Sequence, residues 1–287
     1  MNNIYPIISV IVPCYNQAKY LPEALQSVLD QDYPHWECIV VNDGSPDNTD
    51  EVARRWVNKD SRIKYFRKEN SGVCDTRNFG VKQAIGEYII PLDADDKIGP
   101  HYFTEAVNTF IKHPKVKLIY SDTILFGDRD EEIINPPFVF EKMITENQIF
   151  NSAIFRRKDF LAAGGYNLNM FDGIEDWDFY LSLIQPNDKV VKLNAFHYYY
   201  RIKEVSRSMR IFKETEKNDA MLLQMFKNHL PLFLEYLNPI RNKIEAETYK
   251  NELRWHYNTK EYRFGRITCA PYNFLKKVYH LMRSKED

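Results

Sequence analysis

Short apolar segments alternate with amphipathic ones over the first part of the chain. Three runs, Ile7–Val12, Cys38–Val41 and Ile63–Phe66, are rich in β-branched or aromatic residues and predict buried strands, the first ended by Pro13. Apolar side chains recur at helical spacing over about 20–30 and 49–56, which predicts a helix after each of the first two strands. This alternation with short connections predicts a parallel sheet built from right-handed βαβ units, an α/β fold.

The pattern becomes less regular in the second hundred residues. It predicts a helix over about 100–112, a short strand at 118–120 and an excursion over 124–137. Another strand is expected at 152–155, followed by a short helix that stops at Gly164–Gly165.

A continuous apolar run, Tyr88–Leu92, leads directly into the carboxylates of Asp93, Asp95 and Asp96. The run predicts a buried parallel strand, and open α/β sheets bind ligands at the carboxyl ends of such strands. Clustered negative charges repel one another, and a hard divalent cation compensates for them. Aspartate also favours turns and helix N-caps, so a polar turn explains this stretch equally well.

A second acidic stretch, Glu175, Asp176 and Asp178, opens a predicted helix. Acidic residues in a first turn compensate the helix macrodipole and cap the free N–H groups, which is one interpretation. The other is a carboxylate placed at the mouth of the cleft that the first acidic stretch would line.

Composition excludes several classes of protein. The 287 residues carry a net charge of −1, so a protein that coats nucleic acid is not indicated. No apolar run reaches the roughly 18–20 residues of a membrane-spanning helix, and no secretory signal is visible, so we expect a cytoplasmic protein. Neither a GxGxxG turn after the first strand nor a GxxxxGK[ST] loop is present, so a bound nucleotide would need a metal in place of a glycine-rich phosphate cradle.

Several short motifs follow one another in a fixed order between about residues 7 and 210. They are Val12–Asn16, Val41–Ser45, Gly72 with Arg77–Asn78, Gly86–Tyr88 leading into Leu92–Asp96, Gly164–Tyr166, Glu175–Asp176, and Tyr200–Arg201 with Ser206. In this order they resemble family 2 of the nucleotide-sugar glycosyltransferases, which have the GT-A fold. The resemblance implies a catalytic domain over 1–210, with a nucleotide-sugar half at about 1–97 and an acceptor half at about 98–210. From about residue 211 the motifs end and the pattern becomes helical, which predicts a helical extension over 211–287.

The resemblance implies roles for the residues that would hold the donor. Pro13, Tyr15, Asn16 and Asp43 correspond to the nucleoside pocket, where Asp43 would accept a base N–H and Tyr15 would offer its ring face. Arg77 corresponds to a donor contact, and its fixed guanidinium fork suits either the diphosphate or a carboxylate of the base pocket.

The position that is often a metal-binding histidine in the family, near 203, is Lys203 here. Either a bound metal has fewer protein ligands here, or Lys203 contacts the donor phosphates directly; we expect the direct contact. His197, six residues earlier, is expected to be a packed strand residue and not a ligand.

The metal and the chemistry are implied in the same way. Asp95 corresponds to the direct ligand of Mn²⁺ or Mg²⁺, and Asp93 to a carboxylate that faces the ribose or the metal's water shell. Asp176, with Glu175 beside it, corresponds to the general base that takes the proton of the acceptor hydroxyl as it attacks the anomeric carbon. The resemblance therefore implies an inverting reaction.

These features predict a bacterial transferase that adds one sugar per acceptor, because the QxxRW signature of processive synthases is absent after Asp176. The donor would be a nucleotide-diphosphate sugar, with a UDP-sugar favoured, and the acceptor a glycan or lipid-linked saccharide of the cell surface. Two other classes stay open: a catalytically silent module that binds a nucleotide-sugar or a partner, and a sugar-phosphate nucleotidyltransferase.

The last part of the chain is basic. From residue 254 onward there are eight basic and three acidic residues, and 271–279 reads as a basic amphipathic helix. One interpretation is the solvated face of a docked helix. The other is peripheral contact of 254–285 with the anionic inner leaflet of the cell membrane.

Overall fold

A computed structural model of the chain describes residues 5–203, 215–237, 244, 247–252 and 254–255. The chain divides into two compact units, Met1–Leu230 and Pro231–Asp287. The boundary expected near residue 210 and the motif residue Ser206 lie outside the described residues.

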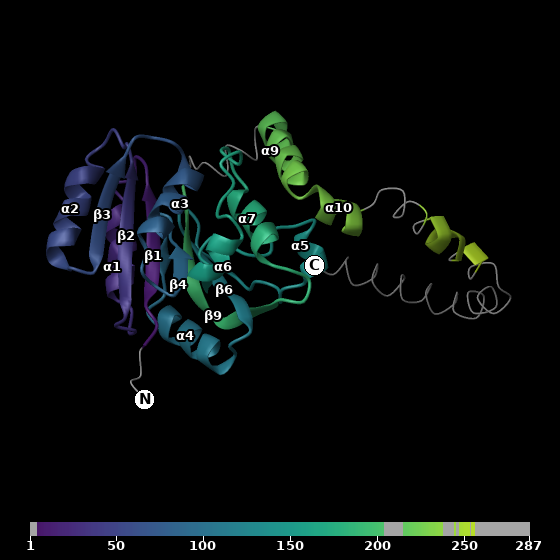
Figure 1. The fold of residues 1–287 in the computed structure, drawn as a ribbon, viewed down its shortest axis with the longest axis horizontal. Coiled ribbons are helices and arrows are strands. Elements are labelled where there is room, and N and C mark those ends of the chain that lie inside the picture. The colour runs from purple at the N-terminus through teal and green to yellow at the C-terminus, as the bar shows by residue number, and fades with distance from the viewer. Residues whose placement is uncertain (1–4, 204–214, 238–243, 245–246, 253, 256–287) are drawn as a thin grey trace, which may run out of the picture. The chain divides into compact units, whose positions relative to one another are not determined.

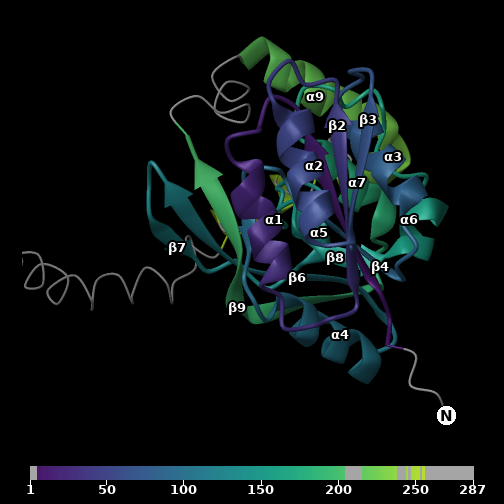
Figure 2. The same ribbon diagram turned by 90° about the vertical axis from the view of Figure 1, so that its left-hand side faces the viewer.

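The first half of the large unit is a parallel sheet with helices on both faces (Figures 1 and 2). Its strands, in spatial order, are β3 (Ile63–Lys68), β2 (Trp36–Asp43), β1 (Ile8–Cys14) and β4 (Tyr88–Pro91). Its helices are α1 (Leu21–Leu29), α2 (Thr49–Lys59) and α3 (Val73–Gln83). Figure 2 looks onto the face that α1 and α2 cover, and α3 lies on the opposite face.

Helix α3 packs unusually close to the sheet. Gly80 has no side chain, and a Cβ at this position would lie 2.5 Å from Cγ2 of Ile11 on β1. Since glycine permits this approach, the buried face of α3 carries Arg77 toward the carboxyl end of the strands.

The first strand does not end where we expected. Pro13 was predicted to end it, but β1 continues through Cys14 and pairs with β2 as far as Asn42. The pairing of β1 with β4 stops at Ile11 and Pro91, so the missing N–H of Pro13 removes no ladder bond on that side.

The second half of the sheet is mixed. β8 (Ile154–Arg156) is antiparallel to both β4 and β6, and β6 is parallel to β9. The remaining elements of this half are β5 (Lys97–Ile98), α4 (Tyr102–Lys112), β6 (Val116–Gly127), β7 (Glu131–Ile133), α5 (Phe140–Met143), α6 (Arg157–Ala162), α7 (Glu175–Leu183) and β9 (Lys189–Ile202).

The strand expected at 118–120 is much longer than predicted, because β6 runs from Val116 to Gly127 beside β9. The excursion expected from residue 124 is therefore partly strand, and β7 returns along the edge of β6. Long-range pairing with β9, which follows about 70 residues later in the sequence, extends this strand.

Two further helices follow, α9 (Thr215–Asn228) and α10 (Leu230–Tyr236). Among the residues that the structure describes, no helix is both long and apolar enough to cross a bilayer. Most of the basic segment 254–285 lies outside these residues.

Candidate active site

The carboxyl ends of the neighbouring parallel strands β2, β1 and β4 meet at one edge of the sheet, and β4 leads there into the acidic loop, Asp93–Asp96. Such an edge is where open α/β sheets bind ligands. Asp96 lies in the interior, whereas Asp93 and Asp95 keep part of their surface exposed. The loop therefore offers two carboxylates to a ligand and uses the third internally.

Strand β9 is fastened to this loop through Asp96. The carboxylate of Asp96 accepts hydrogen bonds from the Tyr198 hydroxyl, at 2.5 Å, and from the Arg201 backbone N–H, at 2.8 Å. Burial, followed by the charges of Asp95 and Asp93, holds the pKa of Asp96 well above its usual range. These contacts fix the end of β9 beside the acidic loop.

The residue that follows β9 is Lys203, and its ammonium donates a hydrogen bond to Oδ2 of Asp95. The same ammonium lies 4.9 Å from the centre of the Tyr20 ring. Lys203 is thus already paired with the predicted metal ligand, and the predicted contact between Lys203 and the donor phosphates stays a prediction. His197 is buried and stacks on Tyr102, as expected for a packed strand residue.

Arg77 joins the acidic loop to helix α7. Its guanidinium donates to Asp93 Oδ1 at 2.8 Å and to Glu175 Oε1 at 2.9 Å, and only 2% of the side chain is exposed. We call Arg77, Asp93 and Glu175 the Arg77 bridge. The predicted donor contact of Arg77 stays a prediction, since the contacts in the structure are with two carboxylates.

The predicted general base stands next to this bridge, in the first turn of α7. Asp176 Oδ2 accepts a hydrogen bond from Asn147 Nδ2 at 3.2 Å, and Oδ1 accepts one from the Trp177 N–H at 2.8 Å. Although part of Asp176 remains accessible to solvent, burial and then the charge of Glu175 raise its pKa to about 6. A carboxylate with this pKa is ionised at neutral pH and still basic enough to accept a proton.

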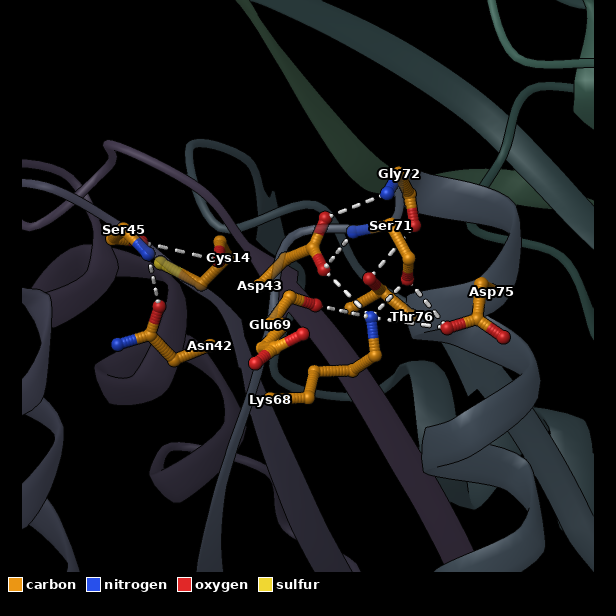
Figure 3. A network of polar contacts seen from close by, with 10 residues as sticks. All are labelled: Cys14, Asn42, Asp43, Ser45, Lys68, Glu69, Ser71, Gly72, Asp75 and Thr76. Atoms are coloured by element: carbon orange, nitrogen blue, oxygen red, sulfur yellow. Dashed lines mark hydrogen bonds and ion pairs between the residues drawn. The ribbon is translucent and has the colours of Figure 1, made fainter.

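Asp43, a predicted nucleoside contact, lies at the end of β2 within a network of hydrogen bonds (Figure 3). Oδ1 of Asp43 accepts hydrogen bonds from Lys68 Nζ at 2.8 Å and the Ser71 N–H at 3.0 Å, and Oδ2 accepts one from the Gly72 N–H at 2.9 Å. Lys68 is further held by Asp75, at 3.0 Å. This network fixes the Asp43 carboxylate before any ligand binds.

The other predicted nucleoside residues lie on the loop after β1. Tyr15 has half of its surface exposed, Asn16 has a positive φ of 56°, and Pro13 is buried in β1. The Asn16 N–H donates to Ser45 Oγ, which ties this loop to the one after β2. The Tyr15 ring is therefore available for contact at the same edge of the sheet as Asp43.

The residues present fit a divalent metal ion in their chemistry. Asp93 and Asp95 each give one oxygen to a cation, and the second oxygen of each has no hydrogen bond to a described residue. Carboxylate oxygen is the ligand that Mg²⁺ and other hard cations prefer. Within the described part of the chain, no group of three or more His, Cys, Asp or Glu side chains is assembled for metal binding, so further ligands would come from the donor or water.

Several contacts of this site were not predicted. Asn147 reaches Asp176 from a loop that carries no sequence signal, and Tyr198 binds Asp96 from a strand about 100 residues away. Lys68 could have been suspected, because it ends the strand next to β2.

The fold and site together are those of a GT-A protein: a mostly parallel, curled α/β sheet with carboxylates and an anchored Asp43 at its ligand-binding edge. The profile of glycosyl transferase family 2 matches residues 9–163, and the chain belongs to this family. The resemblance seen in the sequence and the predicted GT-A fold are thereby confirmed.

Among curated relatives, the chain is 30% identical over 252 residues to the minor teichoic acid biosynthesis protein GgaB of Bacillus subtilis. The match covers 80% of this chain and 28% of GgaB, so the chain spans well under half of that relative.

Two solved structures share the fold. TarS 1-349 of S. aureus, in complex with UDP-GlcNAc, superposes with a TM-score of 0.60 at 24% identity over 70% of this chain and 60% of that one. The mannosyltransferase PcManGT of Pyrobaculum calidifontis, in complex with GDP-Man and Mn²⁺, gives 0.60 at 19% identity over 93% and 85%.

Proposed function

We propose that this protein transfers one sugar from a nucleotide-diphosphate sugar to a hydroxyl of a glycan or lipid-linked acceptor, with inversion, in the synthesis of a cell-surface polysaccharide. Family membership supports the reaction class, and the relative GgaB, named for teichoic acid biosynthesis, supports the setting. The complexes of TarS with UDP-GlcNAc and of PcManGT with GDP-Man support the type of donor.

The single observation that carries the proposal is the Arg77 bridge. It connects the acidic loop, where a donor diphosphate would bind, to the first turn of α7, where Asp176 stands. Since both carboxylates are held by one buried guanidinium, the donor end and the base are fixed relative to each other.

Asp176 acts as the general base in this proposal. A sugar hydroxyl is a weak nucleophile, and a positioned base accelerates such an attack by roughly 10²–10⁴-fold. The pKa of about 6 leaves Asp176 ionised at neutral pH, and its hydrogen bonds to Asn147 and Trp177 orient the carboxylate. The proton moves from the acceptor hydroxyl to Asp176 as that oxygen attacks the anomeric carbon.

Asp95 and Asp93 would hold a bound Mn²⁺ or Mg²⁺, which supplies a Lewis acid for the negative charge of the departing nucleoside diphosphate. The complex of PcManGT with Mn²⁺ supports this part of the proposal. Arg77 keeps Asp93 oriented toward the site, and the hydrogen bond between Asp96 and Tyr198 holds the acidic loop against β9.

The hydrogen bonds of Asp43 support a uracil base over guanine (Figure 3). Oδ1 already accepts two hydrogen bonds and Oδ2 accepts one, so a carboxylate with about four acceptor positions has one left. Uracil presents a single N–H on its pairing edge, whereas guanine presents N–H groups at two neighbouring positions. A UDP-sugar therefore fits this pocket better than a GDP-sugar.

Release of UDP from a panel of UDP-sugars in the presence of Mn²⁺ tests the proposal. Asp176→Asn is expected to lower the rate by roughly 10²-fold or more, because it removes the base, and to leave UDP binding intact. Asp188→Asn, just beyond the other end of α7, serves as the matched control and should keep the wild-type rate. Equal rates in wild type and Asp176→Asn would contradict the assigned base.

A catalytically silent binding module is the second candidate, and the pairing of Lys203 with Asp95 is the observation that favours it. Such a module would bind UDP, with no release of UDP from any UDP-sugar. The same assay therefore separates the two functions.

We also propose that the basic segment 254–285 brings the enzyme to the inner face of the cell membrane, beside a lipid-linked acceptor. Its excess of basic residues supports attraction to anionic lipid. Deleting residues 269–287, which carry four of the eight basic residues, should weaken sedimentation with vesicles of anionic lipid and leave UDP binding unchanged. Equal sedimentation of the full and shortened chains would remove this part of the proposal.

A further inference from the structure

The ammonium of Lys203 is paired with the carboxylate of Asp95, which the proposed function assigns to the metal. It donates to Asp95 Oδ2, and both side chains are 19% exposed, so the pair lies in a partly desolvated site. Tyr20 offers its ring face to the same ammonium, at 4.9 Å. Lys203 is therefore held in place by Asp95 and Tyr20. The Lys203 and Asp95 side chains remain accessible to solvent and to ligands.

A divalent cation bound to Asp95 would stand within a few ångströms of this ammonium. Like charges this close repel each other, and a divalent cation repels the ammonium twice as strongly as a monovalent cation would. Two other cations contact the acidic loop. Arg77 is buried and held by two carboxylates, so it cannot move away. Arg201 is paired with Glu23 and donates to the backbone oxygen of Asp95, not to its carboxylate. Lys203 is the cation that can be displaced, because its long side chain reaches the site from the end of β9.

We propose that Lys203 and the divalent cation compete for Asp95, and that binding of the nucleoside diphosphate shifts this competition toward the cation. This inference rests on the proposed function. In the free enzyme Lys203 neutralises Asp95 and weakens metal binding. When the diphosphate binds, its oxygens take over the Lys203 ammonium, and Asp95 becomes free for the metal.

The consequence is a strong coupling between the two ligands. If the diphosphate raises the affinity for the metal by some factor, the metal raises the affinity for the diphosphate by the same factor. The enzyme would then assemble its metal site only together with the donor, and Lys203 would become a contact of the leaving group.

The test is a titration of the protein with Mn²⁺, in which free Mn²⁺ is followed by electron paramagnetic resonance, without and with saturating UDP. Without UDP, Lys203→Met should bind Mn²⁺ about tenfold more tightly than wild type, and UDP should tighten Mn²⁺ binding about tenfold less in the variant. Lys203→Arg keeps the charge and should resemble wild type.

Lys97→Met is the matched control. It removes the same charge from the neighbouring strand β5, where Lys97 lies over the Phe126 ring and has no contact with Asp95 in the described structure. It should show wild-type Mn²⁺ binding, which separates the Asp95 contact from a general change of charge. Melting temperatures without ligands check that each variant is folded.

Equal Mn²⁺ affinities of wild type and Lys203→Met without UDP would overturn the inference and leave the proposed function standing. The same holds if Lys203→Met and Lys97→Met change the coupling equally. If wild type binds neither UDP nor Mn²⁺ in any combination, the proposed function and the inference both fail.

Discussion

The carboxylate of Asp176 combines a raised pKa with hydrogen bonds that fix both of its oxygens at the start of α7. Desolvation raises this pKa most, the charge of Glu175 adds to the effect, and Arg77 and the hydrogen bonds oppose it. A base of this kind has consequences for activity and for stability, and each has its own dependence on pH.

The first consequence is a loss of activity in acid. Since only ionised Asp176 accepts a proton, kcat/KM for UDP-sugar turnover should fall about tenfold per pH unit below pH 6. Asn147→Ala removes a hydrogen bond that lowers the pKa, so the fall should begin at higher pH in this variant. A flat profile down to pH 5, or a profile that Asn147→Ala leaves in place, would contradict this role.

The second consequence concerns the free energy of unfolding. The folded-state pKa of about 6 lies above the usual value of 3.8, so the contribution of Asp176 to stability is greatest in acid and is lost as the pH rises through 6. Asp176→Asn should therefore be more stable than wild type at pH 8, by about 1 kcal/mol after allowance for solvent screening.

Urea unfolding at pH 4 and pH 8 measures this difference. The gain in the variant should shrink at pH 4, where the wild-type carboxyl is largely protonated. A variant that is less stable than wild type at pH 8 would show that the ionised carboxylate stabilises the fold.

At the scale of elements, the Arg77 bridge connects α3, the acidic loop after β4 and α7, which are far apart in the sequence. Arg77→Met would leave the mostly buried Glu175 without this partner, and losing one partner of a buried ion pair costs about 3–5 kcal/mol. Arg55→Met on the exposed helix α2 also removes an arginine paired with a glutamate, and should cost less than about 1 kcal/mol. Urea unfolding of both variants is the measurement, and similar losses would contradict a structural role for the bridge.

The buried carboxylate of Asp178 on α7 contacts the end of helix α9. Asp178 accepts hydrogen bonds from Asn228 Nδ2 at 2.8 Å and from Asn167 Nδ2 at 2.6 Å. Its Oδ1 also lies 3.0 Å from Nε2 of His229, the residue that follows α9. Replacing Asn228 and His229 together by alanine should speed amide exchange in 215–228 by about tenfold or more, since this docking is lost.

Hydrogen exchange followed by mass spectrometry measures this effect. Exchange in α4, which does not contact Asp178, is the internal control. Unchanged exchange in 215–228 would mean that Met221 and Met225, which are also buried, hold the helix without the polar contacts.

At the scale of the whole molecule, the first half of the fold could be predicted from local patterns. Strands β1, β2 and β4 are mostly apolar and buried, and β3, which is only partly buried, still begins with a β-branched and aromatic run. The predicted bounds of these four strands, and of the helices expected over about 20–30 and 49–56, agree with the structure to within a few residues. The β6–β9 pair could not be predicted in this way. Its strands pair in parallel across a long sequence separation with register shifts, and local composition carries no record of that pairing.

The site divides along the same line. Asp95 and Asp176 were predicted because their acidic stretches fall in the order of the family 2 motifs; taken alone, a turn or a helix cap explains such stretches equally well. That Arg77 would bridge two carboxylates, and that Lys203 would lie on Asp95, depends on where distant elements meet. Such contacts follow from tertiary packing and are invisible to spacing or composition.

The central claim is that the edge formed by Asp43 and the acidic loop binds a nucleoside diphosphate together with a divalent cation. Its most direct measurement is a thermal-shift panel of UDP, GDP, CDP and dTDP, each with Mn²⁺, Mg²⁺ or EDTA, on wild type and Asp95→Ala. Binding at 100 times Kd stabilises a protein by about 2.7 kcal/mol, which such a scan detects readily. The account predicts a shift with UDP that needs the cation and disappears in Asp95→Ala, whereas no shift with any nucleotide and cation in wild type would contradict it.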